Sequence, residues 1–171
     1  MKTVINIIIA SLLLMNVTIA QDAVMLAKGS FDNLKIKGMP LEDLYEIDNG
    51  FEELRELGKP LKVDSVYLSA EPKWIYYYLG FTLTFVQFFP TGPELFEVEV
   101  TDPEAEFYYS GNNLFENSRQ ALRNSLGQIE LEEISSQLTD SEKFGDGHCY
   151  LEYHYSSDVL KRIIFRIDPN L

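Results

Sequence analysis

Short apolar segments, separated by glycine, proline and charged residues, occur along this chain twice in the same order. The first copy has an alternating segment, a glycine turn, a helical segment and aromatic strands (34–41, 51–58 and 73 onward). The second copy follows the same order (107–114, 118–127 and 148 onward). The loop residues Gly38 and Gly111 are 73 residues apart, and Gly58 and Gly127 are 69 apart. An offset this constant indicates an internal repeat.

The apolar spacing predicts three helices. Pro40 suits the first turn of a helix that contains Leu41, Leu44 and Tyr45. The second helix spans 51–57 and ends at Gly58, where a residue without a Cβ terminates helices readily. The third spans 118–126, begins at the capping residue Ser118 and ends before Gly127.

Alternation predicts strands after each helical region. A hairpin loop of two or four residues at Leu79-Gly80 places one set of side chains on the core face: Trp74, Tyr76, Tyr78, Phe81, Leu83 and Phe85. In the next strand, 95–101, we expect Phe96, Val98 and Val100 to point inward and Glu97 and Glu99 outward.

The last hairpin is predicted to join 149–155 to 159–167 through the loop Ser156-Ser157-Asp158. This register places Glu152 opposite Arg162 as an ion pair, and Leu151 opposite Ile163 in the core. The stretch 129–138 fits either strand or helix, 145–147 is predicted to be a flexible turn, and the sequence does not decide the structure of 129–147 as a whole.

These elements predict an α+β fold. Two tandem repeats, each a helical segment followed by antiparallel strands, would form one sheet with helices packed on one face. We expect one domain at 21–171, with repeats at about 34–101 and 105–168.

Residues 1–20 are typical of a secretory signal peptide. Lys2 is their sole charge, an apolar stretch runs from Val4 to Met15, and the segment ends at Ala20. The apolar stretch is shorter than the roughly 20 residues of a membrane-spanning helix. We therefore expect an exported chain, periplasmic or extracellular, without stable membrane insertion.

The composition is strongly acidic. The whole chain has a formal net charge of −13, and without Lys2 the remaining 13 Lys and Arg against 27 Asp and Glu give −14. Such a chain repels nucleic acid and favours basic partners by long-range attraction.

No residue cluster predicts catalysis, a metal or a cofactor. His148 and Cys149 are adjacent on a strand and point to opposite faces, and His148 and His154 lie about 20 Å apart. We expect Cys149 to be a small buried apolar residue. The segment 140–151 fails as a calcium loop because Phe144 and Leu151 occupy ligand positions. Phosphate-binding glycine loops, nucleophile elbows and Cys-x-x-Cys pairs are also missing, so we expect a protein that is not an enzyme.

The remaining candidate site is the sheet face turned away from the helices. Tyrosine and arginine are enriched at binding hot spots, and a twisted sheet made of two copies would present a broad surface. The predicted binding residues are Tyr77, Thr82, Thr84, Glu97, Glu99, Tyr150, Glu152, His154, Arg162 and Arg166.

The order of Gly38, a helix ending in Leu57-Gly58-Lys59-Pro60, and strands at 74–78, 81–85 and 95–98 resembles a known family. It is similar to the small outer-membrane lipoprotein module of the SmpA/OmlA group, whose fold is similar to each half of the β-lactamase inhibitor protein. Two such halves in tandem resemble the inhibitor's architecture over most of 34–168. The resemblance implies a protein-binding role, although the single cysteine leaves no disulfide like those of the inhibitor.

Together these features favour a non-enzymatic exported protein-binding domain of the inhibitor, immunity or envelope-accessory type. The alternative is a small-ligand-binding protein or hydrolase with a pocket between the repeats. The sequence identifies neither the partner nor the oligomeric state.

Overall fold

The computed structural model describes residues 33–45, 52–67, 71–88, 92–109, 111–115, 132–134, 141–145, 149–157 and 159–167. The predicted signal peptide, the predicted helix at 118–126 and His148 lie outside these residues.

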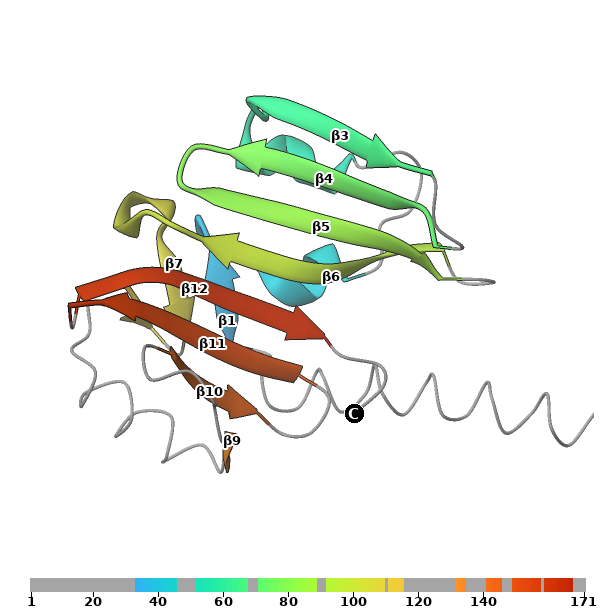
Figure 1. The fold of residues 1–171 in the computed structure, drawn as a ribbon. Helices are drawn as coiled ribbons and strands as arrows, with labels where there is room; N and C mark the ends of the chain where they lie inside the picture. Colours follow the sequence, from blue (N-terminus) through green and yellow to red (C-terminus); the bar gives the residue numbers. More distant parts are fainter. Residues whose placement is uncertain are drawn as a thin grey trace, which may run out of the picture.

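One continuous sheet of eight antiparallel strands forms the larger layer, in the order β3-β4-β5-β6-β12-β11-β10-β9 (Figure 1). Its strands are Lys62–Val66 (β3), Lys73–Tyr78 (β4), Phe81–Phe88 (β5), Gly92–Val100 (β6), Glu132–Ile134 (β9), Ser141–Gly145 (β10), Cys149–Ser156 (β11) and Val159–Ile167 (β12).

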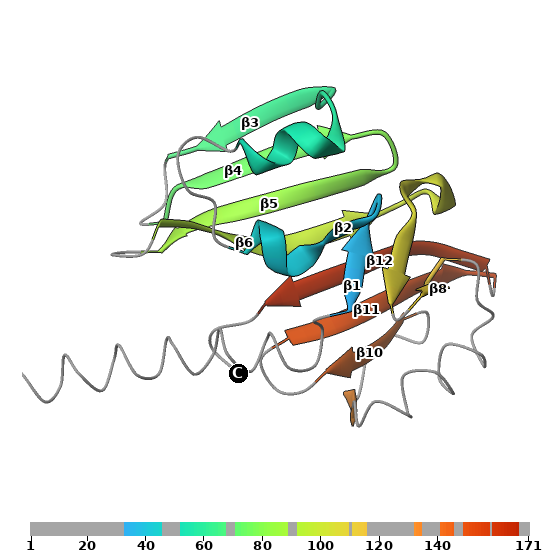
Figure 2. The same cartoon turned by 180° about the vertical axis from the view of Figure 1, so that it is seen from behind.

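A smaller sheet of four strands, in the order β2-β1-β7-β8, covers one side of the larger sheet (Figure 2). Its strands are Leu34–Ile36 (β1), Met39–Pro40 (β2), Phe107–Tyr109 (β7) and Asn112–Asn113 (β8). Three short 3-10 helices connect the strands: Leu41–Leu44 (η1), Glu53–Leu57 (η2) and Pro103–Ala105 (η3).

Both sheets have strands of the two sequence copies at their centre. In the small sheet, Lys35 of β1 lies opposite Tyr108 of β7, and these residues are 73 positions apart, the same offset as Gly38 and Gly111. In the large sheet, β6 of the first copy pairs with β12 of the second. The two copies therefore meet strand against strand in both layers.

The predicted α+β class is wrong. Within the described residues the fold is mostly antiparallel sheet, and no helix there reaches seven residues. The layer expected to consist of helices is instead the four-stranded sheet together with short 3-10 helices (Figure 2). The short segments around Gly38 and Gly111 form this layer because each makes a tight hairpin whose first strand pairs with its counterpart in the other copy.

The helical segments of the first copy are 3-10 turns instead of α-helices. Their buried residues are spaced by three, Leu41 with Leu44 and Leu54 with Leu57, which suits the three residues per turn of a 3-10 helix. Isolated α-helices shorter than about 12 residues are marginal in water. Gly58 has a positive φ of 87°, which ends the helical segment after Leu57 and keeps it short.

The first predicted hairpin is confirmed. Tyr78 pairs with Phe81, so Leu79 and Gly80 form a two-residue loop, and the predicted aromatic set lies on the core face. Gly80 has a φ of +81°, and a Cβ there would lie 2.7 Å from the Cβ of Asp102. Its carbonyl accepts hydrogen bonds from the backbone N–H groups of Thr101 and Asp102, at 2.8 and 3.2 Å. Glycine is therefore required at this turn.

The inward position predicted for Phe96 is wrong. The ladder between β5 and β6 has a bulge, so that Glu97 pairs with Thr84 but Leu95 pairs with Phe85. Phe96 is the extra residue of the bulge. The alternation therefore shifts by one, and Leu95 points into the core, where it is fully buried. Phe96 is half-buried, and its ring lies 5.5 Å from Nζ of Lys73.

The predicted register of the last hairpin is also wrong. Ser156 pairs with Val159, which shortens the expected loop, and a second irregularity follows between His154 and Tyr155. As a result Glu152 lies opposite Ile164 and Leu151 opposite Phe165, two residues away from the predicted partners. A two-residue shift leaves every side chain on its predicted face.

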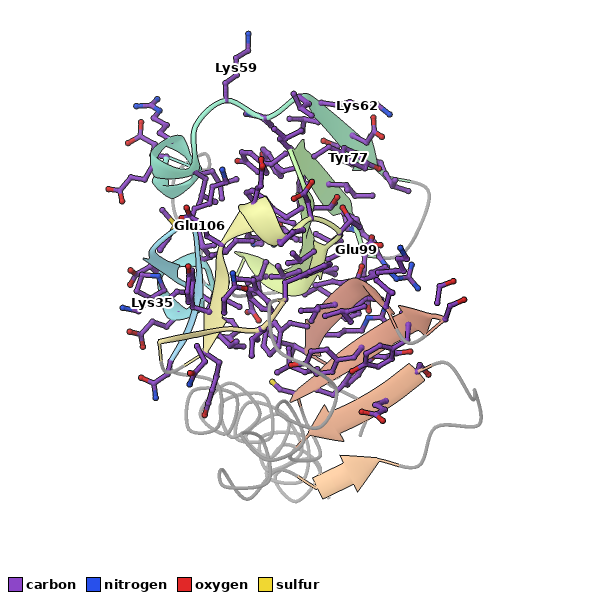
Figure 3. All side chains as sticks on the ribbon, turned by 90° about the vertical axis from the view of Figure 1, so that its left-hand side faces the viewer. Lys35, Lys59, Lys62, Tyr77, Glu99 and Glu106 are labelled. Carbon is purple, nitrogen blue, oxygen red and sulfur yellow. The ribbon has the colours of Figure 1, made fainter. Side chains whose placement is uncertain are left out.

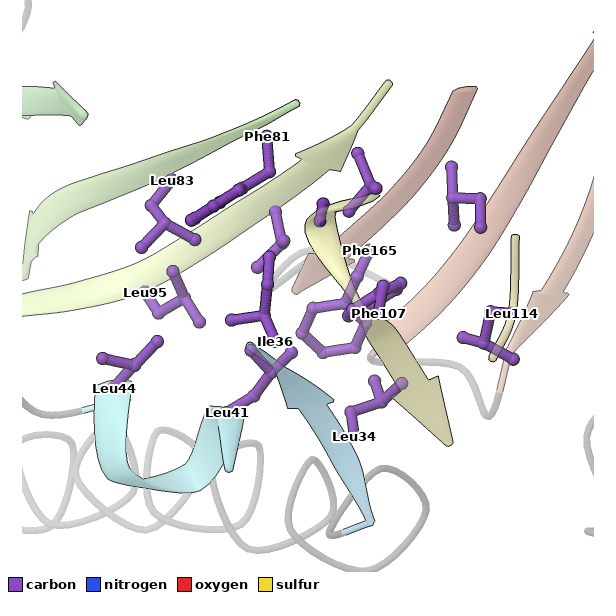
Figure 4. Packing of buried hydrophobic residues seen from close by; sticks show 14 of the residues in the cluster. Leu34, Ile36, Leu41, Leu44, Phe81, Leu83, Leu95, Phe107, Leu114 and Phe165 are labelled. Atoms are coloured by element: carbon purple, nitrogen blue, oxygen red, sulfur yellow. The ribbon is translucent and has the colours of Figure 1, made fainter. Parts of the chain in front are cut away.

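The core fills the space between the two sheets (Figure 4). Leu34, Ile36 and Phe107 of the small sheet and Leu41 and Leu44 of η1 belong to one cluster with residues of the large sheet. The residues contributed by the large sheet include Phe81, Leu83, Leu95, Val98, Leu151, Tyr153, Ile163 and Phe165. Cys149 is 1% exposed and belongs to this cluster, which confirms its prediction as a buried residue.

Candidate functional site

All ten predicted binding residues lie on one face of the large sheet, the side away from the small sheet, which we call the open face. The strand registers connect them in rows: Tyr77, Thr82 and Glu99 pair across β4, β5 and β6, and Thr84 and Glu97 pair in the next row. In Figure 3, Tyr77 and Glu99 lie on the opposite side of the molecule from Lys35 and Glu106 of the small-sheet layer. In the second repeat one row continues from Glu97 to Arg166 and Tyr150, and the other from Glu99 through Ile164 to Glu152, while Arg162 and His154 pair in a third row.

An ion pair joins the repeats at their junction. Arg166 of β12 lies opposite Glu97 of β6, and its Nε donates to the carboxylate at 2.6 Å while Nη2 makes a second contact with the same oxygen. Nη1 of the same guanidinium donates to the hydroxyl of Tyr150 at 2.7 Å. Burial alone would lower the pKa of Arg166, but the hydrogen bond and charge of Glu97 outweigh it and raise the pKa. Arg166 is thus held charged and in one orientation.

Tyr150 lies beneath other side chains of the open face. It is 3% exposed, with Nζ of Lys143 3.5 Å from its ring centre and the guanidinium of Arg166 5.7 Å away. A cation over the ring face is attracted by the ring's quadrupole. Tyr150 therefore orients two cations of the face and is itself covered by them.

A second charged group joins the repeats one row further along. Nη1 of Arg162 donates to Oε1 of Glu99 at 3.3 Å, and Nη2 lies 3.4 Å from Nε2 of His154. Glu152 contacts His154 instead of Arg162, with 2.9 Å between Oε1 and Nε2. The predicted ion pair of Glu152 with Arg162 is wrong because Arg162 lies opposite His154 in the observed register.

His154 is favoured in its neutral form. Its pKa is lowered, chiefly because the ring is partly buried, with Arg162 lowering it further while Glu152 and Glu99 act in the opposite direction. A neutral ring in contact with a carboxylate oxygen at 2.9 Å must carry its proton on Nε2, which then donates to Glu152. His154 therefore serves as a neutral donor between a cation and a carboxylate.

The first-repeat half of the open face is different in character. Ile75, Tyr77, Thr82 and Thr84 are all half-buried and uncharged. Nζ of Lys62 lies 5.3 Å from the centre of the Tyr77 ring. This half offers aromatic and methyl surface next to the charged pairs at the junction.

Side chains of both charges lie on the open face. Its cations include Lys62, Lys73, Lys143, Arg162 and Arg166, and its carboxylates include Asp64, Glu94, Glu97, Glu99 and Glu152. From the alternation in sequence, the first-repeat half of this face is predicted to be acidic and the second-repeat half to carry both charges. Pairing of β6 with β12 brings the acids of one half against the arginines of the other.

Sequence reasoning missed Lys62, Lys73 and Lys143 as part of this surface. The signal for Lys73 was present, because it shares the parity of Tyr77 on one strand. Lys143 lies in 129–147, whose structure the sequence did not decide, so its face was not assigned.

Within the described ranges, His, Cys, Asp and Glu side chains do not gather in groups of three or more that would hold a metal ion. In the same part of the chain, none of the helices has the length and apolar character needed to cross a membrane. Comparison with family models, curated proteins and solved structures found no match to this chain. The resemblance to the SmpA/OmlA group therefore stays a prediction.

Proposed function

We propose that this chain is a non-enzymatic, exported protein-binding domain that binds its partner on the open face. The observation that carries the proposal is the gathering of Tyr77, Thr82, Thr84 and the two arginine groups on one side of a continuous sheet. The opposite side is covered by the small sheet and the 3-10 helices (Figure 2), whereas no described element packs across the open face (Figure 1).

The composition of this face matches that of protein interfaces. Such interfaces have a centre of aromatic and apolar contact surrounded by polar residues, with tyrosine and arginine prominent among the residues that contribute most affinity. Here Tyr77, Ile75 and the two threonines supply the centre. The pairs of Arg166 with Glu97 and of Arg162 with Glu99 form one border of it.

The arginine side chains on this face are already held in place. Arg166 is fixed by Glu97 and Tyr150, and Arg162 by Glu99, before any partner arrives. Ordering a flexible side chain on binding costs roughly 0.5–1.5 kcal/mol, and a side chain held in advance avoids most of this cost. The network therefore favours recognition of a defined partner geometry.

The chain's overall charge acts at longer range. A net charge of about −14 for the exported form attracts a basic partner, while the arrangement of cations and carboxylates on the open face determines which surface fits. An inhibitor, an immunity protein or an envelope-accessory protein would each use such a surface.

Site-specific photocrosslinking in the native host tests the proposal. A photoreactive residue at Thr82 should give a defined adduct with one protein, and this adduct should weaken with Tyr77→Ala. The same residue at Lys35, on the opposite side of the molecule, is the matched control. Equal adducts from both positions, or none from Thr82, would refute a partner on the open face.

The alternative of a pocket between the repeats gains no support from their junction. β6 and β12 pair directly there, Arg166 contacts Glu97 and Arg162 contacts Glu99 across the pair, and Ile164 of β12 is buried.

A further inference from the structure

The strand β3 forms one edge of the large sheet and is unusually apolar for an exposed edge. Leu61 is 73% exposed and Tyr67 65%, and Val63 and Val66 are also exposed. Of the six large apolar residues that are exposed in the described part of the chain, these four lie on β3 or directly beside it. Edge strands present unpaired backbone N–H and C=O groups, so proteins usually protect them with charge, proline or a covering segment.

The outer side of β3 has no strand partner among the described residues, and β4 is its neighbour on the inner side (Figure 1). Figure 3 shows Lys59 and Lys62 extending outward at this end of the molecule. An exposed apolar edge of this kind can accept another strand by backbone hydrogen bonding.

We propose that β3 pairs antiparallel with β3 of a second copy of this chain, with Val63 of the two copies opposite each other. Charge complementarity between two copies of β3 supports this choice of partner. Lys62 and Asp64 lie on the same face of β3, with Nζ and Oδ2 2.5 Å apart in one chain. With Val63 on the two-fold axis, Lys62 of each copy lies opposite Asp64 of the other.

Neighbouring registers are disfavoured by the same charges. Centring the pair on Asp64 would place two aspartates directly opposite each other, and centring it on Lys62 would do the same with two lysines. Like charges in opposed positions destabilise antiparallel pairs, and opposite charges stabilise them. Shifting by one residue would mix the two faces of the sheet. The register centred on Val63 also places Leu61 of one copy beside Ser65 of the other.

The resulting dimer would extend the sheet across both copies. Because residues of the same face lie opposite each other, the two open faces would point to the same side and form one wide surface. This arrangement is independent of whether the open face binds a partner. A contact through one strand buries less than the roughly 1,200 Å² of a stable interface, so a weak, concentration-dependent dimer is expected.

Charge-reversal variants test this pairing. Lys62→Asp places Asp against Asp between the copies, and Asp64→Lys places Lys against Lys, so each single variant should dimerise at least about tenfold more weakly than wild type. An equimolar mixture of the two variants restores opposite charges at both positions and should recover association. The measurement is sedimentation equilibrium over a wide range of protein concentration, at low and high salt.

The matched controls are Lys161→Asp and Glu104→Lys, which make the same charge changes at exposed positions away from β3. They should leave the dissociation constant within about twofold of wild type, and circular dichroism establishes that every variant is folded. A wild-type chain that stays monomeric up to about millimolar concentration overturns the proposal. So does a mixture that associates no better than either single variant.

Discussion

Arg166 and Glu97 are 69 residues apart in sequence, yet they lie opposite each other in neighbouring strands and form a two-point contact across the junction of the repeats. Both side chains are largely shielded from water, with 33% and 20% of their surface exposed. The two halves of the sheet are therefore joined by a side-chain ion pair as well as by the backbone pairing of β6 with β12.

Removing one member of this pair should destabilise the fold. We expect Arg166→Met to lower the free energy of unfolding by about 1–3 kcal/mol, because Glu97 is then left partly buried without its cation. The double variant Arg166→Met with Glu97→Gln should recover part of the loss. Urea unfolding of both single variants and the double variant gives the coupling energy, and a coupling near zero would contradict a structural role for the pair.

Stability should fall as the pH drops below about 6.5, the ordinary pKa of histidine. Because the folded-state pKa of His154 is lowered, the unfolded chain binds more protons between the two values, and acid favours unfolding there. Above about pH 7 His154 is neutral in both states and contributes no pH dependence. Thermal unfolding of wild type and His154→Gln between pH 8 and 5 measures this contribution.

The variant His154→Gln should show a shallower loss of stability in that window, whereas His148→Gln serves as the control for the other histidine. If His154→Gln and wild type change in parallel, His154 is not the titrating group.

Gly80→Ala should cost more than Gly38→Ala. Both glycines have a φ of +81°, so each substitution carries a similar backbone penalty of about 1 kcal/mol. A Cβ at Gly80 also meets Asp102 at 2.7 Å, while one at Gly38 meets no atom within 4 Å. We expect a further cost of about 1–3 kcal/mol at Gly80 from this clash. Equal melting temperatures for the two variants would contradict the close approach of the turn to Asp102.

The bulge in β6 can be tested by truncating its two apolar residues. Leu95→Ala should destabilise by about 2–5 kcal/mol because it leaves a cavity in the core. Phe96→Ala should cost less, since its ring is half-buried beside Lys73 on the open face. Urea midpoints of the two variants compare their stabilities directly. A larger loss for Phe96→Ala than for Leu95→Ala would contradict the bulge and favour the regular alternation predicted from sequence.

The sequence was sufficient to predict which residues share the face of the sheet that forms the candidate site. Period-two alternation assigned all ten residues to one side, and the assignment survived the wrong register of the last hairpin because the error was two residues. Contacts within the site were not predictable. They depend on which strands are neighbours, and the pairing of β6 with β12 follows from the assembled sheet instead of from any local segment.

The sequence by itself determined the repeat offset of Gly38 and Gly111, the position of the hairpin turn at Leu79-Gly80, the burial of Cys149 and the shared face of the ten candidate residues. These features depend on local backbone geometry and on alternation, which are read along the chain. Tertiary structure alone decided that the second layer is a sheet, that Leu95 replaces Phe96 in the core, and that Arg162 contacts Glu99. The physical reason is that short apolar segments fit several local conformations, and the partner against which each is buried selects one of them.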